Sequence, residues 1–245
     1  MPRFFITADC IDGDKILISG DDAYHIARSL RMAVGDALTV CDGNGIEYDC
    51  ELTRIRDEEC ECRIRASAHS KTEPPAYISL YMAYPKGDKL ETVVQKAVEL
   101  GASEIIPFES SRCIKKPKAD KVDKQTARLD RIAREAAKQC GRAKLPCVMP
   151  PLSYTAMLDR ACTADIALFC YEDESATTIR SAIEGKSFST ISIIIGAEGG
   201  FSAEEAAQAC KRGCTSVTLG PRILRCETAP AYALAAISYE IELGK

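Results

Sequence analysis

Short apolar stretches separated by turn residues fill the first 70 residues, a pattern that predicts β-strands. Within it, DGNG (Asp42–Gly45) predicts a hairpin, because Asn and Gly tolerate the positive φ of a tight turn. One helical pattern, Asp21–Met32, interrupts the strands. We therefore predict a small barrel or a strongly bent sheet. Its strands are expected at Phe4–Ile6, at Lys15–Ser19, within Ala37–Ile55 and at Cys60–Ser67.

Two successive prolines in KTEPPA (Lys71–Ala76) end this pattern and mark a short, stiff connection. We place a domain boundary here, with residues 1–72 forming a first domain and residues 73–245 a second.

After the boundary, strand-like and helical patterns alternate. The segment DKLETVVQKAVELG places apolar residues at helical spacing on one face, and Gly101 supplies the stop. Near-continuous aliphatic strands between such helices indicate an α/β fold with a mostly parallel sheet covered by helices. Further strands are expected in ISLYMAY, EIIPF, ADIALFC, ISIII and SVTLG, and helices at Lys124–Cys140, Thr177–Glu184, from Ala203 and at Ala231–Leu243.

Two glycine-containing loops follow strands of this second region. In IIIGAEGGFSAEE, Gly196, Gly199 and Gly200 allow a ligand to approach the backbone, and Ser202 with Glu205 predicts a helix-starting capping box. In GPRILRCETAP (Gly220–Pro230), arginines and an acid precede the last helix. Neither loop has the motif of a dinucleotide or nucleoside triphosphate site, which disfavours those ligands.

The two loops and several other segments of the chain resemble a known protein family. IIIGAEGGFSAEE and LGPRILRCETAPAYAL, with KGDKLETVVQKAVELGASEIIPF, QCGRAKLP and HIARSLRMAVGDALTVCDGNG, resemble the bacterial 16S ribosomal RNA (uracil-N3)-methyltransferase family of the SPOUT (α/β-knot) class. The resemblance covers nearly the whole chain. It departs from the family pattern at Ala197, Ala143 and Cys226, where family members usually have Pro, Ser and Thr.

The resemblance implies a PUA-like RNA-binding β-barrel at 1–72 and a trefoil-knotted, dimerising methyltransferase domain at 73–245. It implies S-adenosylmethionine as the cofactor and uridine N3 in the 16S rRNA of the small ribosomal subunit as the acceptor, giving 3-methyluridine. The implied cofactor-binding residues are Gly196, Glu198, Gly199, Gly200, Leu219, Gly220, Ile223, Leu224, Arg225, Thr228 and Ala229.

Methylation at N3 requires loss of the N3 proton, so a general base or a cation beside the uracil carbonyls would serve. We hypothesise that Arg225 faces the developing anion, with Glu198 or Glu227 as base or as the group that orients Arg225. The transfer needs no metal. The alternatives are a non-catalytic RNA-binding assembly protein, a SPOUT methyltransferase with another acceptor atom, and an enzyme that uses the glycine loops for a different nucleotide.

The distribution of charge along the chain favours RNA as a binding partner. The net charge is −4, yet Arg112–Pro146 holds twelve basic and four acidic residues, an excess typical of polyanion binding. We predict a phosphate-binding stripe on the 124–140 helix, with further contacts from the first domain's helix and from the KGDK segment. The RNA-binding residues are predicted to be Arg28, Arg31, Lys86, Lys124, Arg128, Arg131, Arg134, Lys138 and Arg142.

The remaining composition indicates a cytoplasmic protein. No apolar run approaches the ~20 residues that cross a bilayer, and the N-terminus has no secretory pattern. Thirteen cysteines at irregular spacing, with only two histidines, predict mostly buried thiols in a reducing compartment and no metal site. A homodimer is expected, with the apolar C-terminal helix as the candidate interface.

Overall fold

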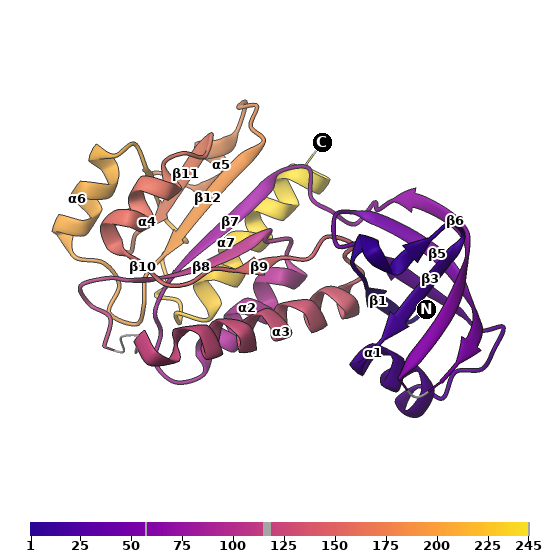
Figure 1. Ribbon diagram of the computed structural model, residues 1–245. Coiled ribbons are helices and arrows are strands. Elements are labelled where there is room, and N and C mark those ends of the chain that lie inside the picture. Colours follow the sequence, from indigo (N-terminus) through magenta and orange to yellow (C-terminus); the bar gives the residue numbers. More distant parts are fainter. Residues whose placement is uncertain (57, 115–118, 245) are drawn as a thin grey trace. The chain divides into compact units, whose positions relative to one another are not determined.

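The structure is a computed structural model that describes residues 1–56, 58–114 and 119–244. Its contacts divide the chain into two compact units (Figure 1). The first unit comprises Met1–Glu73 and Ala137–Leu145, and the second comprises Pro74–Ala136 and Pro146–Lys245. The sequence suggested two contiguous stretches, whereas the contacts group 137–145 with the N-terminal residues.

The first unit is a curled six-stranded sheet with strand order β1-β4-β5-β6-β3-β2. Its neighbouring strands are antiparallel except for the parallel pair β1–β4. The strands are β1 (Arg3–Phe5), β2 (Ile11–Asp12), β3 (Lys15–Ser19), β4 (Ala37–Cys41), β5 (Ile46–Ile55) and β6 (Glu59–His69). The helical elements are η1 (Ala8–Cys10), α1 (Asp21–Tyr24) and the π-helical η2 (His25–Ser29).

Alternation along these strands explains the core of the first unit. In β3 every second residue is buried, so Ile16 and Ile18 face inward while their neighbours face solvent. Three cysteines share this core with the aliphatic side chains, as the composition predicted: Cys50, Cys60 and Cys62. In the described part of the chain every cysteine is a free thiol, and most are buried.

The second unit contains a seven-stranded sheet in which every recorded pairing is parallel. Its order is β10-β8-β7-β12-β11-β13, with β9 paired to β8. The strands are β7 (Tyr77–Ala83), β8 (Glu104–Glu109), β9 (Cys147–Val148), β10 (Leu152–Ser153), β11 (Ile166–Cys170), β12 (Thr190–Ile195) and β13 (Thr215–Val217). The predicted parallel sheet is confirmed.

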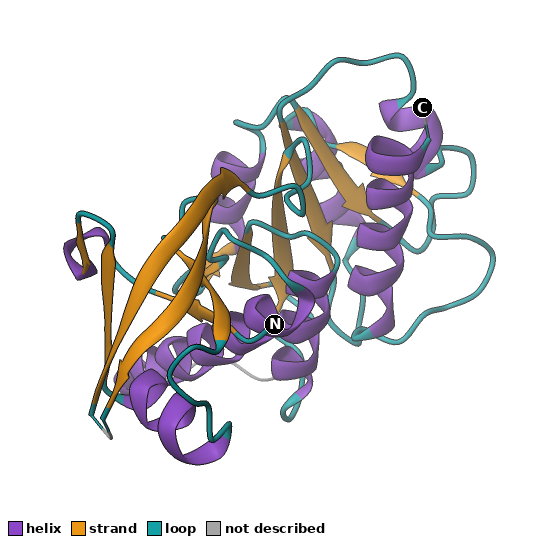
Figure 2. Cartoon of the chain, turned by 90° about the vertical axis from the view of Figure 1, so that its right-hand side faces the viewer, coloured by secondary structure: helices purple, strands orange, loops and turns teal. Residues whose placement is uncertain are grey.

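Helices lie on both sides of this sheet (Figure 2). The α4 helix packs against β7, β8 and β12, and α2 packs against α7. The helices are α2 (Lys89–Glu99), η3 (Ala119–Lys121), α3 (Val122–Cys140), α4 (Tyr154–Ala161), α5 (Ile179–Ile183), α6 (Ala203–Lys211), α7 (Thr228–Ser238) and the π-helical η4 (Tyr239–Leu243).

The sequence analysis did not predict α4. This helix begins at Ser153, whose hydroxyl accepts a hydrogen bond from the Ala156 amide, so an N-cap signal was present. The predicted apolar face of α2 is confirmed, because Leu90, Val93, Val94, Ala97 and Val98 are all buried.

Candidate active site

Three neighbouring strands of the parallel sheet end at one cavity. Because β12, β11 and β13 are adjacent and parallel, their carboxyl ends lie at the same edge, where open parallel sheets bind ligands. A cavity of about 240 Å³ lies there, and both predicted loops contribute to it. Its lining residues are Cys170, Tyr171, Glu172, Ile195, Gly196, Ala197, Glu198, Gly199, Gly200, Thr218, Leu219, Gly220, Arg222, Ile223, Leu224, Cys226 and Ala229.

The first loop, residues 196–200, is a tight turn that the neighbouring chain holds closely. Gly200 has φ +62°, and a Cβ atom there would collide with the carboxylate of Glu172. That carboxylate accepts a hydrogen bond from the Phe201 amide at 3.3 Å. Arg112 Nη1 donates to the Gly199 carbonyl at 2.9 Å. The next residues form the predicted capping box of Ser202 and Glu205, which is confirmed.

Glu198 carries the charge of this loop. Its Oε1 accepts hydrogen bonds from Lys89 Nζ at 2.9 Å and from the Lys86 amide at 3.1 Å. Burial alone would raise the pKa of Glu198, but hydrogen bonds from Lys89 and from backbone amides lower this pKa to about 2. A carboxylate with so low a pKa is a weak base near neutral pH. In the structure Glu198 therefore pairs with Lys89. The sequence hypothesis had suggested that Glu198 orients Arg225.

The second loop, residues 219–227, is more exposed. Ile223 has 86% of its surface exposed although it lines the cavity, and Arg222 and Arg225 are exposed as well. Cys226 is buried, and its thiol donates a hydrogen bond to Glu227 Oε2 at 3.2 Å. Burial, followed by this bond, raises the pKa of Cys226 to about 12. The same bond lowers the pKa of Glu227.

Most of the predicted cofactor residues line the cavity, and two do not. Arg225 and Thr228 are absent from the described lining; instead, the Arg225 carbonyl accepts hydrogen bonds from the Thr228 and Ala229 amides at the start of α7. The sequence analysis missed the segment after β11, including Tyr171 and Glu172. The signal was available, because ADIALFC is a buried strand followed at once by the acidic run YEDE.

The sequence of this chain is similar to that of known RNA methyltransferases. Residues 72–238 match the family model described as an RNA methyltransferase domain, and residues 18–65 match the one described as an RNA methyltransferase PUA domain. The chain belongs to the RNA methyltransferase family. The predicted fold class, a SPOUT α/β domain with a PUA-like N-terminal domain, is confirmed.

Individual members of this family resemble the chain over almost its full length. The chain is 36% identical to ribosomal RNA small subunit methyltransferase E of Bacillus subtilis (strain 168), covering 99% of this chain and 98% of that protein. A crystal structure of ribosomal RNA small subunit methyltransferase E from Neisseria gonorrhoeae, bound to S-adenosyl methionine, superposes with a TM-score of 0.87. That protein is 32% identical, and the match covers 97% of this chain and 96% of the other.

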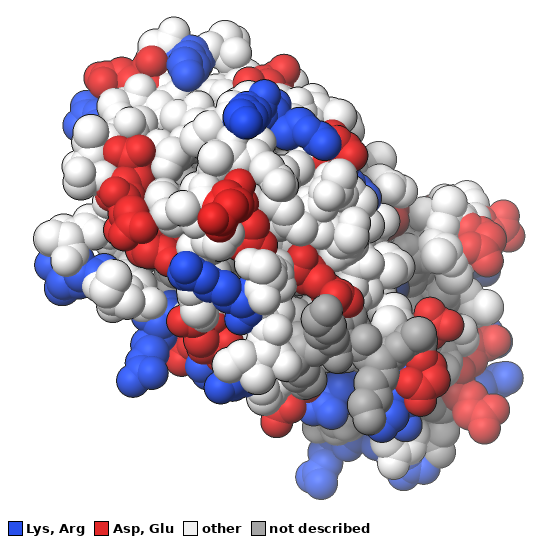
Figure 3. All heavy atoms as spheres, turned by 90° about the vertical axis from the view of Figure 1, so that its left-hand side faces the viewer, with Lys and Arg blue, Asp and Glu red and all other residues white. Residues whose placement is uncertain are grey.

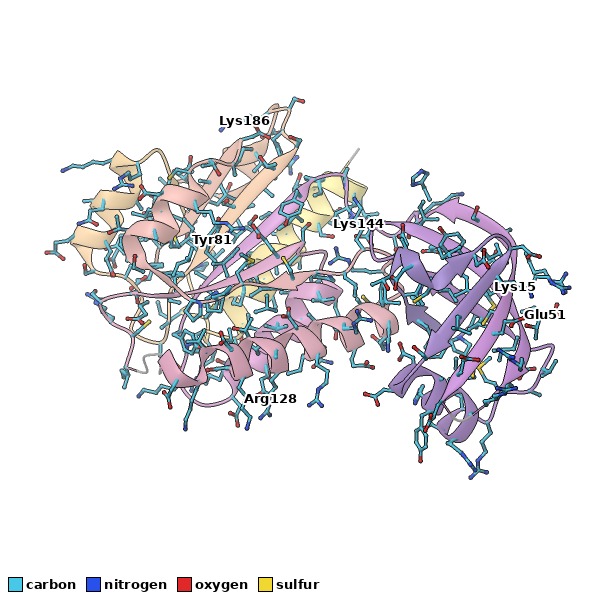
Figure 4. All side chains as sticks on the ribbon, in the orientation of Figure 1. Lys15, Glu51, Tyr81, Arg128, Lys144 and Lys186 are labelled. Atoms are coloured by element: carbon cyan, nitrogen blue, oxygen red, sulfur yellow. The ribbon has the colours of Figure 1, made fainter. Side chains whose placement is uncertain are left out.

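The basic residues of this RNA methyltransferase separate into two groups. On the predicted apolar side of α3, Leu129, Ala133 and Ala136 are buried. On the opposite side, Lys124, Arg128 and Arg131 are exposed. Arg128, labelled in Figure 4, forms an ion pair with Glu91 at 2.9 Å. Acidic and basic side chains are interleaved on the face drawn in Figure 3. Lys115, Lys116 and Lys118, which extended the predicted basic segment, lie outside the described residues.

Two members of the predicted stripe have structural roles in the first unit. Arg142 is only 4% exposed and donates two hydrogen bonds to Glu73 Oε2, at 2.9 and 3.2 Å. Lys138 forms an ion pair with Asp22 at 2.7 Å, with 16% of its side chain exposed. Because its buried guanidinium is already paired, we leave Arg142 out of the proposed phosphate contacts. Lys138 is similarly occupied.

Of the other predicted RNA contacts, Arg28, Arg31 and Lys86 are exposed and Arg134 is half-buried. Arg28 and Arg31 lie at the end of the helical segment of the first unit, where Arg31 has φ +51°. Lys86 is exposed in the loop between β7 and α2. Among the described residues, no group of three or more His, Cys, Asp or Glu side chains is arranged to hold a metal ion. None of the helices in the same part of the chain has the length and apolar character to span a membrane.

Proposed function

We propose that this protein is an S-adenosylmethionine-dependent methyltransferase that acts on the 16S rRNA of the small ribosomal subunit. The product is 3-methyluridine, formed at the N3 atom of one uridine in the decoding region. The observation that carries this proposal is the meeting of the 196–200 and 219–227 loops at one cavity on the carboxyl edge of a parallel sheet. The family match and the names of the relatives support the RNA substrate.

The lining of the cavity suits this cofactor. Ile195, Ile223 and Leu224 offer apolar contact for an adenine ring, and the glycines of the first loop leave its backbone accessible. The charged side chains in the described lining are Glu172, Glu198 and Arg222. Two carboxylates and one guanidinium favour a ligand with cationic groups and one carboxylate over a polyphosphate. When bound, the cofactor supplies a methyl group activated by a positively charged sulfur.

The residues of the chain assist at the uracil. In this proposal the guanidinium of Arg225, exposed beside the cavity, faces the carbonyl oxygens that carry negative charge once N3 is deprotonated. Glu198 and Glu227 both have lowered pKa values, which makes them weak bases. We therefore propose that they position neighbouring side chains and that the N3 proton of the uracil is lost to solvent.

The RNA is expected to meet exposed basic residues of both units. These are Lys124, Arg128 and Arg131 on α3, together with Lys86, Arg28 and Arg31, and the half-buried Arg134 of α3 is proposed to add to them. We also propose a trefoil knot in the second unit, a cytoplasmic location and a homodimer. The exposed side chains Tyr232, Tyr239 and Leu243 near the C-terminus make that region the candidate dimer interface.

Nucleoside analysis tests the proposed function. Unmodified small subunits and naked 16S rRNA are each incubated with the protein and a donor labelled in its methyl group, and the digested nucleosides are identified by mass spectrometry. We expect label in 3-methyluridine. Label in a ribose or in another base would identify a different acceptor atom, and RNA binding without incorporation would favour a non-catalytic assembly protein.

A further inference from the structure

One lysine outside the predicted loops contacts both of them. Lys89 Nζ lies 2.9 Å from Glu198 Oε1, in the first loop. The same nitrogen lies 3.5 Å from Glu227 Oε2 and 3.6 Å from Cys226 Sγ, in the second loop. A single ammonium group therefore connects the two walls of the cavity.

The position of Lys89 is fixed by the helix that it begins. Lys89 is the first residue of α2, whose buried face anchors it in the second unit and which packs against α7, the helix that follows the second loop. A cation in the first turn of a helix is unfavourable, because the amino end of the helix dipole is positive. The helix itself therefore does not explain a lysine here, whereas the two facing carboxylates do.

The charges of this group persist at neutral pH. The hydrogen bond to Glu198 raises the pKa of Lys89, so its amine stays protonated. The lowered pKa values of Glu198 and Glu227 keep both carboxylates ionised. Lys89 is thus unsuited to be a proton acceptor, and it is suited to hold two anions at a fixed separation.

We propose that Lys89 is a positioning residue that clamps the two cavity loops together through Glu198 and Glu227. The clamp sets the width of the cavity before any ligand enters. Its link to cofactor binding rests on the proposed function, whereas the clamp itself is a property of the free protein.

Hydrogen exchange in the ligand-free protein tests the clamp directly. Lys89→Met keeps the length of the side chain and removes its charge. We expect exchange of the hydrogen-bonded amides of the two loops to accelerate by about tenfold, because both loops open more often. These amides are Gly200 in the first loop, and Gly220, Thr228 and Ala229 at the ends of the second. Lys96→Met is the matched control: Lys96 lies on the same helix and pairs with Glu99 at 2.8 Å. Unchanged exchange in either loop of Lys89→Met, or an equal effect of Lys96→Met, would overturn the clamp.

Calorimetry with S-adenosylhomocysteine then tests its consequence. We expect Lys89→Met to bind about tenfold more weakly than the wild type, and Lys89→Arg to recover most of the affinity because it keeps the charge. Without the ammonium, the hydrogen bond from Lys89 that lowers the pKa of Glu198 is lost, so burial raises this pKa while the Lys86 amide still lowers it. The negative charge of Glu227, the other partner of Lys89, adds to the rise. The affinity of Lys89→Met should therefore fall from pH 7 to pH 5, whereas that of the wild type stays flat.

The two tests separate the proposals. Equal affinity and equal pH dependence in Lys89→Met and the wild type would show that the lysine does not position the cofactor site. A wild type that fails to bind S-adenosylhomocysteine would reject the proposed function, and the exchange experiment would still decide the clamp.

Discussion

The two loops of the cavity differ in how firmly the protein holds them. In the first loop, Arg112 binds the Gly199 carbonyl, Lys89 and Lys86 bind Glu198, and Glu172 lies against Gly200. In the second loop, the hydrogen bonds recorded for 220–225 lie at its ends: the Gly220 amide bonds to Thr218, and the Arg225 carbonyl accepts from the start of α7. Between these ends, the side chains of Arg222 and Ile223 are exposed.

This difference suggests that the two loops have different roles in binding and catalysis. A wall that is already formed lowers the entropy lost when a ligand is ordered against it. An exposed wall can adjust to the ligand and can present its side chains to a second substrate. We therefore expect the first loop to contribute most of the cofactor affinity. The second loop should contribute a smaller share through Arg222 and Ile223, which line the cavity, and should supply Arg225 for the chemistry. Lys89 links the two loops.

The largest effect should come from the second loop. Arg225→Ala is expected to lower the methylation rate by about 100-fold or more, the range found when one donor to a developing anion is removed. Calorimetry should show S-adenosylhomocysteine affinity unchanged, because Arg225 does not line the described cavity. Arg222→Ala is the matched control, since Arg222 lines the cavity and should affect affinity more than rate. A rate for Arg225→Ala equal to that of the wild type would remove the proposed catalytic role.

A smaller effect should come from the turn of the first loop. In Gly200→Ala the new Cβ must displace the Glu172 carboxylate, which lines the cavity, and φ +62° adds about 1–2 kcal/mol of strain. We expect S-adenosylhomocysteine affinity to fall by about tenfold, close to the loss of one charge-assisted hydrogen bond.

Gly213→Ala separates the strain from the displacement. Gly213 also has positive φ, at +97°, but its Cβ would meet open space away from the cavity. Thermal denaturation should show both variants destabilised, while calorimetry should show lost affinity for Gly200→Ala alone. Equal affinities of the two variants would mean that the turn does not shape the cavity.

The sequence could predict the loops but not what holds them. Glycines after aliphatic strands, and the Ser202–Glu205 box, are local patterns, so the loops and the start of α6 were readable from neighbouring residues. The contacts of Lys89 and Glu172 depend on β7, β12 and β11 being adjacent in the sheet, which is not their order along the chain. A pattern of neighbouring residues in the sequence cannot show which distant strands are adjacent in the sheet.

Two members of the basic stripe, Lys138 and Arg142, are paired within the protein for a related reason. Helical spacing correctly placed the buried and charged sides of α3, because spacing depends on the helix alone. Whether a given cation is free depends on partners elsewhere: Glu73 occupies Arg142, and Asp22 occupies Lys138. Periodicity identifies a charged face, and only tertiary structure shows which of its charges are already used.

The smallest expected effect comes from Ile223, in the exposed second loop of the cavity. Ile223 is 86% exposed, so Ile223→Ser removes little packing and should change the free energy of unfolding by less than about 0.5 kcal/mol. If Ile223 covers the apolar part of the cofactor, S-adenosylhomocysteine affinity should nevertheless fall about fivefold, the loss of roughly 1 kcal/mol of apolar contact. Ile114→Ser, at a residue 73% exposed and outside the described lining, should leave affinity unchanged. A drop in stability without a drop in affinity would place Ile223 among the structural residues and would contradict an adjustable second wall.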